Sequence, residues 1–246
     1  MSVPQRRGQD STDAARLISA LSQHSGALEA YRVLRTNLRF VSVDRPVRTI
    51  TITSALPGDG KTLTTANLGI ALAMDGVRVA LVDADLRHPM LHRLLGVQRG
   101  CGLTSVLTRE ATLDEALTFT PLENLSVLPA GPVPPNPTEL VSTQALANLH
   151  EELLGRVDMV LMDTPPVLAA ADAALTAARC DGVLLVVRAG VTDRRLALRA
   201  REALENVHAR VLGAVLSGVQ EGDAYGYYYG YYGHAGHDGG KARRIQ

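Results

Sequence analysis

Two patterns of hydrophobic and polar positions alternate along most of this chain of 246 residues. Short runs that are apolar on both faces predict buried strands, and apolar positions at helical spacing predict helices between them. The predicted strands are residues 48–54, 77–83, 125–129, 157–163, 181–187 and 209–217, and the main predicted helices are 28–41, 62–74, 169–178 and 192–207. Short helices are expected up to residue 117, and another helix ends near residue 154. This alternation indicates a single α/β domain with a mostly parallel sheet and helices on both faces.

The two ends of the chain lack this pattern. Residues 1–25 are polar without periodicity, so we expect a flexible lead before a domain that spans residues 26–220. Residues 221–246 are rich in glycine, which is costly to order, and are expected to form a flexible tail. Six of the seven tyrosines lie there, at Tyr225, Tyr227, Tyr228, Tyr229, Tyr231 and Tyr232. Alone, such a cluster could also be a sticky or β-prone segment.

The helix predicted over residues 28–41 has an apolar face and a charged ridge. Its apolar positions are Leu28, Tyr31, Leu34, Leu38 and Val41. The ridge carries Glu29, Arg32 and Arg35. From the residues alone, a solvated charged face is the preferred interpretation, because exposed ion pairs at this spacing contribute only about 0.2–0.5 kcal/mol each.

Composition narrows the class of protein. The 25 basic residues equal the 25 acidic ones, so overall charge favours no nucleic acid and no anionic membrane. Cys101 and Cys180 are far apart and have no metal-ligand spacing, which favours reduced thiols in a cytosolic protein. No apolar run reaches the length of about 18–20 residues that a membrane span needs. We therefore expect a cytoplasmic protein whose membrane association would require a partner.

The segment SALPGDGKT at residues 54–62 has the features of a phosphate-binding loop, because it follows a strand and opens a helix. Its glycines allow backbone N–H groups to surround phosphate oxygens, Lys61 would reach the β- and γ-phosphates, and Thr62 would bind Mg²⁺. The first glycine of the motif is replaced by Ala55, so an ordinary strand-to-helix turn is the alternative. The predicted ATP-binding residues are Pro57, Gly58, Asp59, Gly60, Lys61, Thr62 and Leu63.

Acidic residues end two of the predicted strands. Asp83 and Asp85 follow the run at 77–83, and Asp163 ends the run at 157–163. Because the carboxyl ends of parallel strands meet at one sheet edge, these carboxylates should lie beside Lys61 and Thr62. Each aspartate alone could be a helix cap or a turn former. Together they predict a Mg²⁺–ATP site in which Thr62, Asp85 and Asp163 hold the metal.

At these motifs the sequence resembles the bacterial tyrosine kinases (BY-kinases) that control capsule and exopolysaccharide synthesis. The resemblance covers about residues 26–246 and rests on EAYRVLR, PGDGKT, LVDADLRHP, LMDTPP and the tyrosine-rich end. It implies a Mg²⁺-dependent protein-tyrosine kinase that phosphorylates its own tail in trans within a ring of subunits, with Glu29, Arg32 and Arg35 at the ring interface. It also implies a stand-alone form, a separate membrane activator of the polysaccharide copolymerase type and a cognate phosphotyrosine phosphatase.

Two positions depart from related proteins. Ser217 stands where the family usually has asparagine, which puts a side-chain contact to adenine in doubt. Leu56 stands where MinD/ParA-type ATPases carry a signature lysine, which favours the kinase over an ATPase switch. An ATPase of that class without a protein acceptor, and a scaffold that only binds ATP, remain the alternatives.

The expected chemistry assigns separate roles to the candidate residues. Lys61, the loop amides and Mg²⁺ would stabilise the developing charge, and Asp83 would orient the tyrosine hydroxyl and then accept its proton. Tyrosine and aspartate differ by about six pKa units, or about 8 kcal/mol, so the proton must transfer late, as the O–P bond forms. The acceptors are within reach, because nine flexible residues from Val219 to Tyr228 span about 17 Å.

Overall fold

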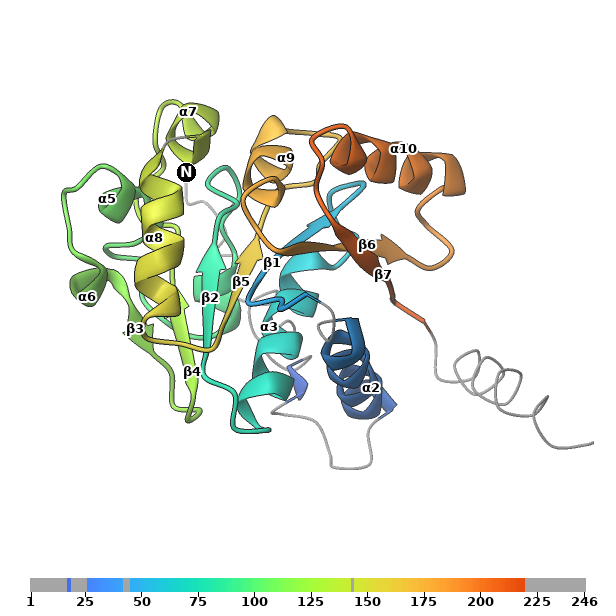
Figure 1. Ribbon diagram of the computed structural model, residues 1–246, viewed down its shortest axis with the longest axis horizontal. Helices are drawn as coiled ribbons and strands as arrows, with labels where there is room; N and C mark the ends of the chain where they lie inside the picture. Colours follow the sequence, from blue (N-terminus) through green and yellow to red (C-terminus); the bar gives the residue numbers. More distant parts are fainter. Residues whose placement is uncertain (1–16, 19–25, 42–44, 143, 220–246) are drawn as a thin grey trace, which may run out of the picture.

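The computed structural model describes residues 17–18, 26–41, 45–142 and 144–219 (Figure 1). Its centre is a sheet of seven strands in the order β3-β4-β2-β5-β1-β6-β7. The strands are β1 Thr49–Ser54, β2 Val79–Asp83, β3 Thr118–Phe119, β4 Leu125–Leu128, β5 Met159–Asp163, β6 Gly182–Arg188 and β7 Val211–Ser217. All neighbours are parallel except the edge pair of β3 and β4. The six predicted strands are therefore confirmed, and β3 is an addition too short to show a periodicity.

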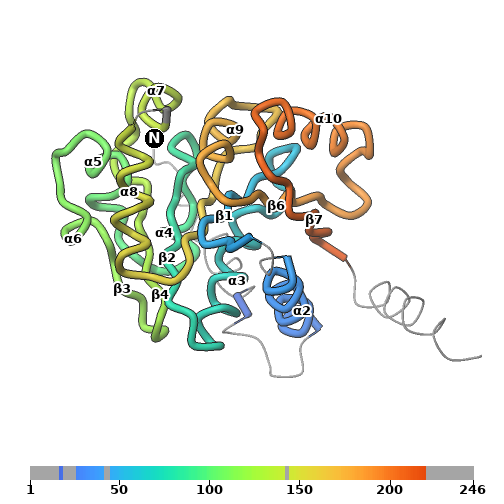
Figure 2. Tube along the Cα trace, viewed as in Figure 1, coloured from blue at the N-terminus to red at the C-terminus, as the bar shows by residue number. Residues whose placement is uncertain are grey.

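Helices cover both faces of this sheet, as the tube of the chain shows (Figure 2). They are α2 Gly26–Val41, α3 Lys61–Ala73, α4 Leu91–Leu94, α5 Leu103–Leu107, α6 Leu113–Ala116, α7 Pro137–Ser142, α8 Gln144–Leu154, α9 Ala171–Ala177 and α10 Arg194–Glu205. The α/β fold class with a mostly parallel sheet is confirmed. The proline-rich stretch before Pro137 connects β4 to α7.

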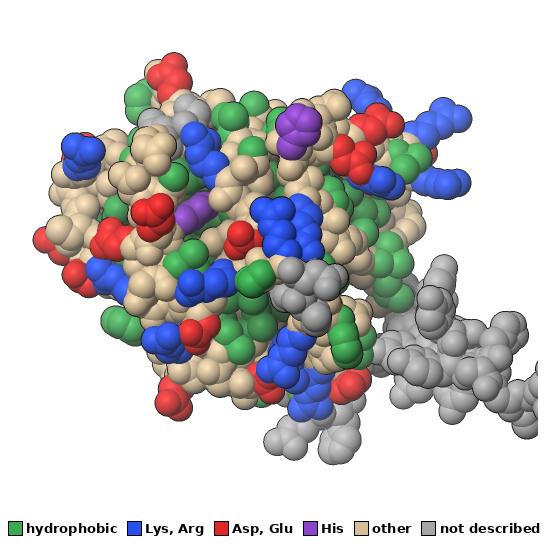
Figure 3. All heavy atoms as spheres, in the orientation of Figure 1, with side chains coloured by type: hydrophobic (Ala, Val, Ile, Leu, Met, Phe, Trp, Pro, Cys, Tyr) green, Lys and Arg blue, Asp and Glu red, His purple; other side chains and the backbone are tan. Residues whose placement is uncertain are grey.

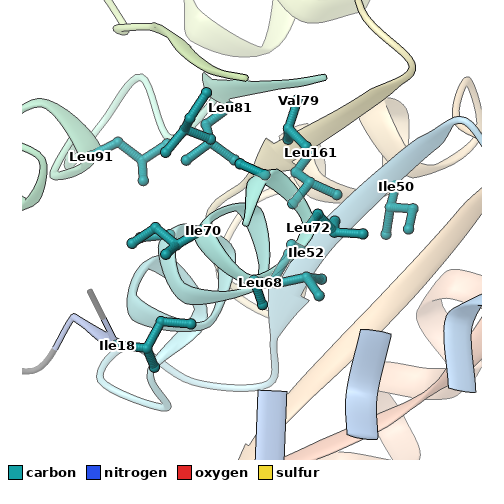
Figure 4. Close-up of a cluster of buried hydrophobic side chains, with 14 of the residues drawn as sticks. Ile18, Ile50, Ile52, Leu68, Ile70, Leu72, Val79, Leu81, Leu91 and Leu161 are labelled. Carbon is teal, nitrogen blue, oxygen red and sulfur yellow. The ribbon is translucent and has the colours of Figure 1, made fainter. Parts of the chain in front are cut away.

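Alternate residues of the central strands enter different hydrophobic clusters, because successive side chains of a strand point to opposite faces. On β2, Leu81 joins the cluster that contains α2 and α3, whereas Ala80 and Val82 join the cluster with α5 and α8. A third cluster packs α9 and α10 against β6. Figure 4 shows the first cluster, with side chains of α3 lying among those of β1, β2 and β5. Both faces of the sheet are thus buried, as its apolar strands predict.

The amino-terminal lead is described only at Leu17 and Ile18, and there the prediction of flexibility is wrong. Both side chains are buried, and the Ile18 amide donates a hydrogen bond to Asn67 Oδ1 at 3.0 Å. Ile18 lies beside α3 in Figure 4. The short apolar stretch around Leu17 and Ile18 shows no clear periodicity, so this anchor was not predicted. The rest of residues 1–25 and the tail at 221–246 lie outside the described residues.

The predicted apolar face of α2 is confirmed. Leu28 and Leu38 are buried, and Tyr31 and Leu34 pack against the same cluster as α3. Arg35, however, is not on an exposed ridge: its guanidinium bonds Ala71 O at 3.2 Å and lies 3.1 Å from Asp75. Glu29 and Arg32 form an exposed ion pair at 3.3 Å. Glu29 and Arg32 of the predicted ridge are therefore exposed, whereas Arg35 connects α2 to the carboxyl end of α3.

Charges of both signs are scattered over the face shown in Figure 3, in keeping with the balanced composition. Among the described residues, no helix has both the length and the apolar character of a membrane-crossing segment. Cys101 and Cys180 are free thiols, and burial raises the pKa of Cys180 to about 12.

Candidate active site

The phosphate-binding loop connects β1 to α3 at the carboxyl edge of the sheet. Gly58 and Gly60 have φ values of 86° and 95°, in the left-handed region that favours glycine. The first turn of α3 contains no acidic residue, and Gly60 has no side chain with which to cap the helix. The amides at this helix start are therefore suited to an anion such as a phosphate group.

The three predicted carboxylates meet beside this loop. Asp83 and Asp163 are paired in register on neighbouring strands. Lys61 Nζ donates a hydrogen bond to Asp85 Oδ2 at 2.8 Å and lies 3.8 Å from Asp163 Oδ1. It also lies 3.3 Å from Thr62 Oγ1. The structure thus brings together the lysine, the threonine and the acidic strand ends as the topology predicts, although the role of each residue stays a prediction.

Burial dominates the electrostatics of this cluster. It raises the pKa of Asp83 well above its usual range, and it raises the pKa of Asp163 against the opposing charge of Lys61. Burial alone would lower the pKa of Lys61, but the negative charges of Asp163 and Asp85 outweigh it and the pKa is raised. Lys61 is therefore a permanent positive charge in a nearly buried place, where electrostatic interactions are strong.

The donor set is compatible with Mg²⁺. Asp83 Oδ1 and Asp163 Oδ2 are buried and have no hydrogen-bond partner among the residues that the structure describes. Within the described ranges, no group of three or more His, Cys, Asp or Glu side chains is arranged to enclose a metal ion. Mg²⁺ does not require such a group, because it keeps several waters and is usually bound by one or two carboxylates and substrate phosphates. The residues thus fit a metal held together with a nucleotide.

Asp83 and Asp85 are both buried, at 0% and 2% exposure, but only Asp85 lines the pocket. Asp83 is fully buried, and its Oδ2 accepts hydrogen bonds from the amides of Met90 and Leu91, both at 3.0 Å. Asp85 borders the open pocket, where its Oδ1 accepts from the His88 amide at 3.0 Å. The geometry therefore does not support Asp83 as the group that meets the tyrosine hydroxyl, and it makes Asp85 the better candidate.

A pocket of about 550 Å³ opens in front of the loop and Asp85. One wall comes from the loop and the start of α3, and the other comes from the segment after β2 and the segment after β5. Its lining residues are Pro57, Gly58, Gly60, Lys61, Thr62, Leu63, Asp85, Arg87, His88, Met90, Arg93, Leu94, Pro165, Pro166, Ala169 and Ala170. Asp59, which the loop motif predicts as an ATP-binding residue, is absent from this lining.

The side chain of Asp59 instead holds the loop in place. It is 1% exposed, and its carboxylate accepts hydrogen bonds from the Leu56 amide at 3.0 Å and from Thr192 Oγ1 at 2.7 Å. Ser217 Oγ donates to Asp59 O at 2.5 Å, and Arg188 donates to Gly58 O at 3.1 Å. Apart from the contact with Leu56, the sequence could not reveal these bonds, because the partners lie more than 100 positions away.

The other predicted site residues lie elsewhere. Arg35 contacts the carboxyl end of α3, whereas the loop is at its amino end, about 20 Å away for a helix of 13 residues. The six tail tyrosines lie outside the described residues. The described chain ends at Val219, two positions after Ser217, whose hydroxyl touches the loop.

Comparisons with known proteins agree with this geometry. A family model described as an AAA domain matches residues 47–197. The tyrosine-protein kinase YwqD of Bacillus subtilis strain 168 is 43% identical over 202 residues, which cover 81% of this chain and 85% of YwqD. The kinase domain of the Escherichia coli tyrosine kinase ETK superposes with a TM-score of 0.80 and 31% identity, over 85% of this chain and 80% of that domain.

A second class of protein shares the fold less closely. The septum site-determining protein MinD from Pyrococcus horikoshii, complexed with Mg-ADP, superposes with a TM-score of 0.61 and 30% identity. This match covers 71% of this chain and 72% of MinD. The kinase domain therefore matches a larger part of this chain, with a higher score, than the MinD structure does.

Proposed function

This chain belongs to the bacterial tyrosine-protein kinases, and from that premise we propose that it phosphorylates the tyrosines of its own carboxyl-terminal segment with ATP. One observation carries the proposal: Lys61, Asp85 and Asp163 meet at a glycine loop to which the end of β7 is hydrogen-bonded through Ser217. The chain continues from there into the segment that holds six tyrosines. The first of these tyrosines, Tyr225, is thus eight positions after the residue that contacts the loop.

The geometry supports a proposal for the residues that would bind Mg²⁺ and ATP. Thr62 and Asp163 would hold the metal, with Asp85 assisting through a water molecule, and the loop amides with Lys61 would bind the phosphates. Bound Mg²⁺ would neutralise charge on the phosphate oxygens during transfer. The nucleotide of the MinD complex, Mg-ADP, supports the same choice of ligand for this loop.

The transfer step assigns the proton to Asp85. A bond forms between the tyrosine oxygen and the γ-phosphorus, and the bond from that phosphorus to the bridging oxygen breaks. ADP leaves with the electron pair, and the phenolic proton passes to the Asp85 carboxylate. The proton moves late, since early deprotonation by an aspartate costs about 8 kcal/mol. Lys61 stabilises charge throughout, because its neighbours keep it protonated.

The direct test of this function is to incubate the purified full chain with Mg-ATP and to measure phosphotyrosine and free phosphate together. A kinase produces phosphotyrosine that maps to residues 225–232. An ATPase switch of the MinD type produces free phosphate alone, and a scaffold that only binds ATP produces neither. The absence of phosphotyrosine under conditions where ADP forms would contradict the proposal.

We also propose the cellular setting that the resemblance implies. The kinase would act in the cytoplasm within a ring of identical subunits and would regulate capsule or exopolysaccharide synthesis. A separate membrane protein of the polysaccharide copolymerase type would activate and recruit it, and a phosphotyrosine phosphatase would reverse its action. The exposed Glu29–Arg32 pair on α2 supports a subunit contact, since both side chains are available to a neighbour.

Substitutions of the charged residues of α2 should affect assembly and the free energy of unfolding differently. Replacing Glu29 and Arg32 by alanine should leave the free energy of unfolding nearly unchanged, because the pair is exposed, but should reduce assembly and trans-phosphorylation. Replacing Arg35 by alanine should also lower the free energy of unfolding by about 1–2 kcal/mol, because its bonds to Ala71 and Asp75 are lost. Light scattering and denaturant unfolding measure the two effects. If the mass of the assembly and the kinase activity are unchanged in the double variant, Glu29 and Arg32 belong to a solvated face and not to a subunit contact.

A further inference from the structure

The pocket beside Lys61 has an excess of positive charge on its outer wall. Lys61 is balanced by Asp85, and Arg87 is balanced by Asp172 at 3.0 Å. Arg93 also lines the pocket, is exposed, and forms no ion pair with any residue that the structure describes. The exposed side chain of His88 stands on the same wall. An unbalanced guanidinium at the rim of an active site is suited to a phosphate, which it can bind through two charge-assisted hydrogen bonds.

The position of Arg93 relative to the reacting groups is fixed by the fold. Arg93 lies on α4, whose first amides, Met90 and Leu91, are hydrogen-bonded to the buried Asp83 at the end of β2. Leu91 and Leu94 on either side of it are buried. The helix that carries Arg93 is therefore anchored to the same strand end that leads to Asp85. This arrangement makes Arg93 part of a preformed wall.

The proposed substrate presents a phosphate close to the next acceptor once it is partly phosphorylated. Each of the six tail tyrosines has another tyrosine within two positions, as in the pairs Tyr225–Tyr227 and Tyr229–Tyr231. In an extended peptide, side chains two positions apart lie on the same side, about 7 Å from each other. Once one tyrosine of a pair is phosphorylated, it carries a charge of about −1.5 to −2 beside the next acceptor.

We propose that Arg93, with His88, binds a phosphotyrosine next to the acceptor, so that the kinase prefers tyrosines with an already phosphorylated neighbour. This inference rests on the proposed function, and the phosphoryl transfer takes place as described there. The first phosphate on a tail is then added slowly and the later ones quickly. Arg93 acts as a specificity-determining residue for a phosphorylated substrate.

The distribution of phosphates on the full chain tests the inference. The phosphatase-treated protein is incubated with Mg-ATP until each chain carries one phosphate on average, and intact mass is then measured. Six independent and equivalent sites would give a binomial distribution, with about 40% of chains singly phosphorylated, about a third unmodified and about a quarter multiply phosphorylated. We expect singly phosphorylated chains well below this share and unmodified and highly phosphorylated chains above theirs, and Arg93→Gln should restore the binomial distribution. Arg199→Gln, at another exposed arginine on α10, is the matched control and should keep the two populations.

A peptide assay separates this inference from the proposed function. Two peptides of residues 221–233 keep Tyr229 as acceptor, have phenylalanine at the other tyrosines, and carry either phosphotyrosine or phenylalanine at position 227. We expect kcat/KM to be about 10-fold or more higher for the phosphorylated peptide, and the ratio to fall to about 2-fold in Arg93→Gln. Equal rates, or an independent distribution on the wild-type tail, would overturn the inference and leave the kinase function intact. If neither the tail nor a peptide gains phosphotyrosine, the proposed function itself fails.

Discussion

Replacing Lys61 by methionine should reduce tail phosphorylation by at least about 100-fold, the typical loss when a preorganised group that stabilises transition-state charge is removed. Lys61 is nearly buried and lies 2.8 Å from Asp85 and 3.8 Å from Asp163. Methionine is apolar and similar in length, so it fills the space without the charge. The loss should appear both as weaker nucleotide binding and as slower transfer, because the proposed role of Lys61 is to bind the β- and γ-phosphates.

The same variant should also be less stable without nucleotide. Asp85 and Asp163 would face each other without the intervening positive charge, and breaking a buried pair by removing one partner costs several kcal/mol. Circular dichroism and thermal unfolding would show whether the fold remains. The control is Lys241→Met, which removes the second of the two lysines in the sequence, outside the described residues. Full tail phosphorylation by Lys61→Met, or an equal loss in Lys241→Met, would contradict the assignment.

The sequence predicted those parts of the site that depend on topology. The apolar runs before Asp83 and Asp163 indicated buried parallel strands, and the carboxyl ends of parallel strands meet at one edge. Their convergence on Lys61 therefore followed from order along the chain. The apolar face of α2 followed equally well from helical periodicity, because Tyr31 and Leu38 are seven positions apart, close to two helical turns, and both pack in the same cluster.

The parts that the sequence did not predict depend on the direction of single side chains. Asp59 stands in the glycine loop, yet its carboxylate turns away from the pocket to Thr192, which is 133 positions later. Arg35 shares the helical face of Glu29 and Arg32 in projection, but Asp75 and the Ala71 carbonyl draw it onto α3. The directions of these side chains depend on partners that are distant in sequence, so local periodicity does not predict them.

The distinction between Asp83 and Asp85 is of the same kind, since of these two buried carboxylates only Asp85 lines the pocket. Asp83 ends β2 and is fully buried, whereas Asp85 belongs to the turn that borders the pocket. Sequence reasoning favoured Asp83 as the proton acceptor. A substrate hydroxyl must come within hydrogen-bond distance of its acceptor, so the pocket geometry favours Asp85.

Replacing Asp85 by asparagine should therefore slow tyrosine phosphorylation by about 100-fold or more, whereas Asp83→Asn should have a clearly smaller effect. In Asp83→Asn the amide oxygen can still accept from Met90 and Leu91, so α4 stays anchored. The substitution also removes a buried carboxyl whose pKa burial raises, so the folded state without nucleotide should not lose stability. In Asp85→Asn the amide oxygen can still accept from His88, and the chain should fold.

Single-turnover rates at saturating Mg-ATP, together with the affinity for a fluorescent ADP analogue, distinguish these outcomes. The loss in Asp85→Asn should lie mainly in the rate of transfer, because the group removed is the one that orients the hydroxyl and receives its proton. A loss confined to nucleotide or Mg²⁺ affinity would show that Asp85 serves the metal alone. If Asp83→Asn instead abolishes transfer while Asp85→Asn retains it, the proton-accepting role returns to Asp83, and the pocket must open further around β2 when substrate binds.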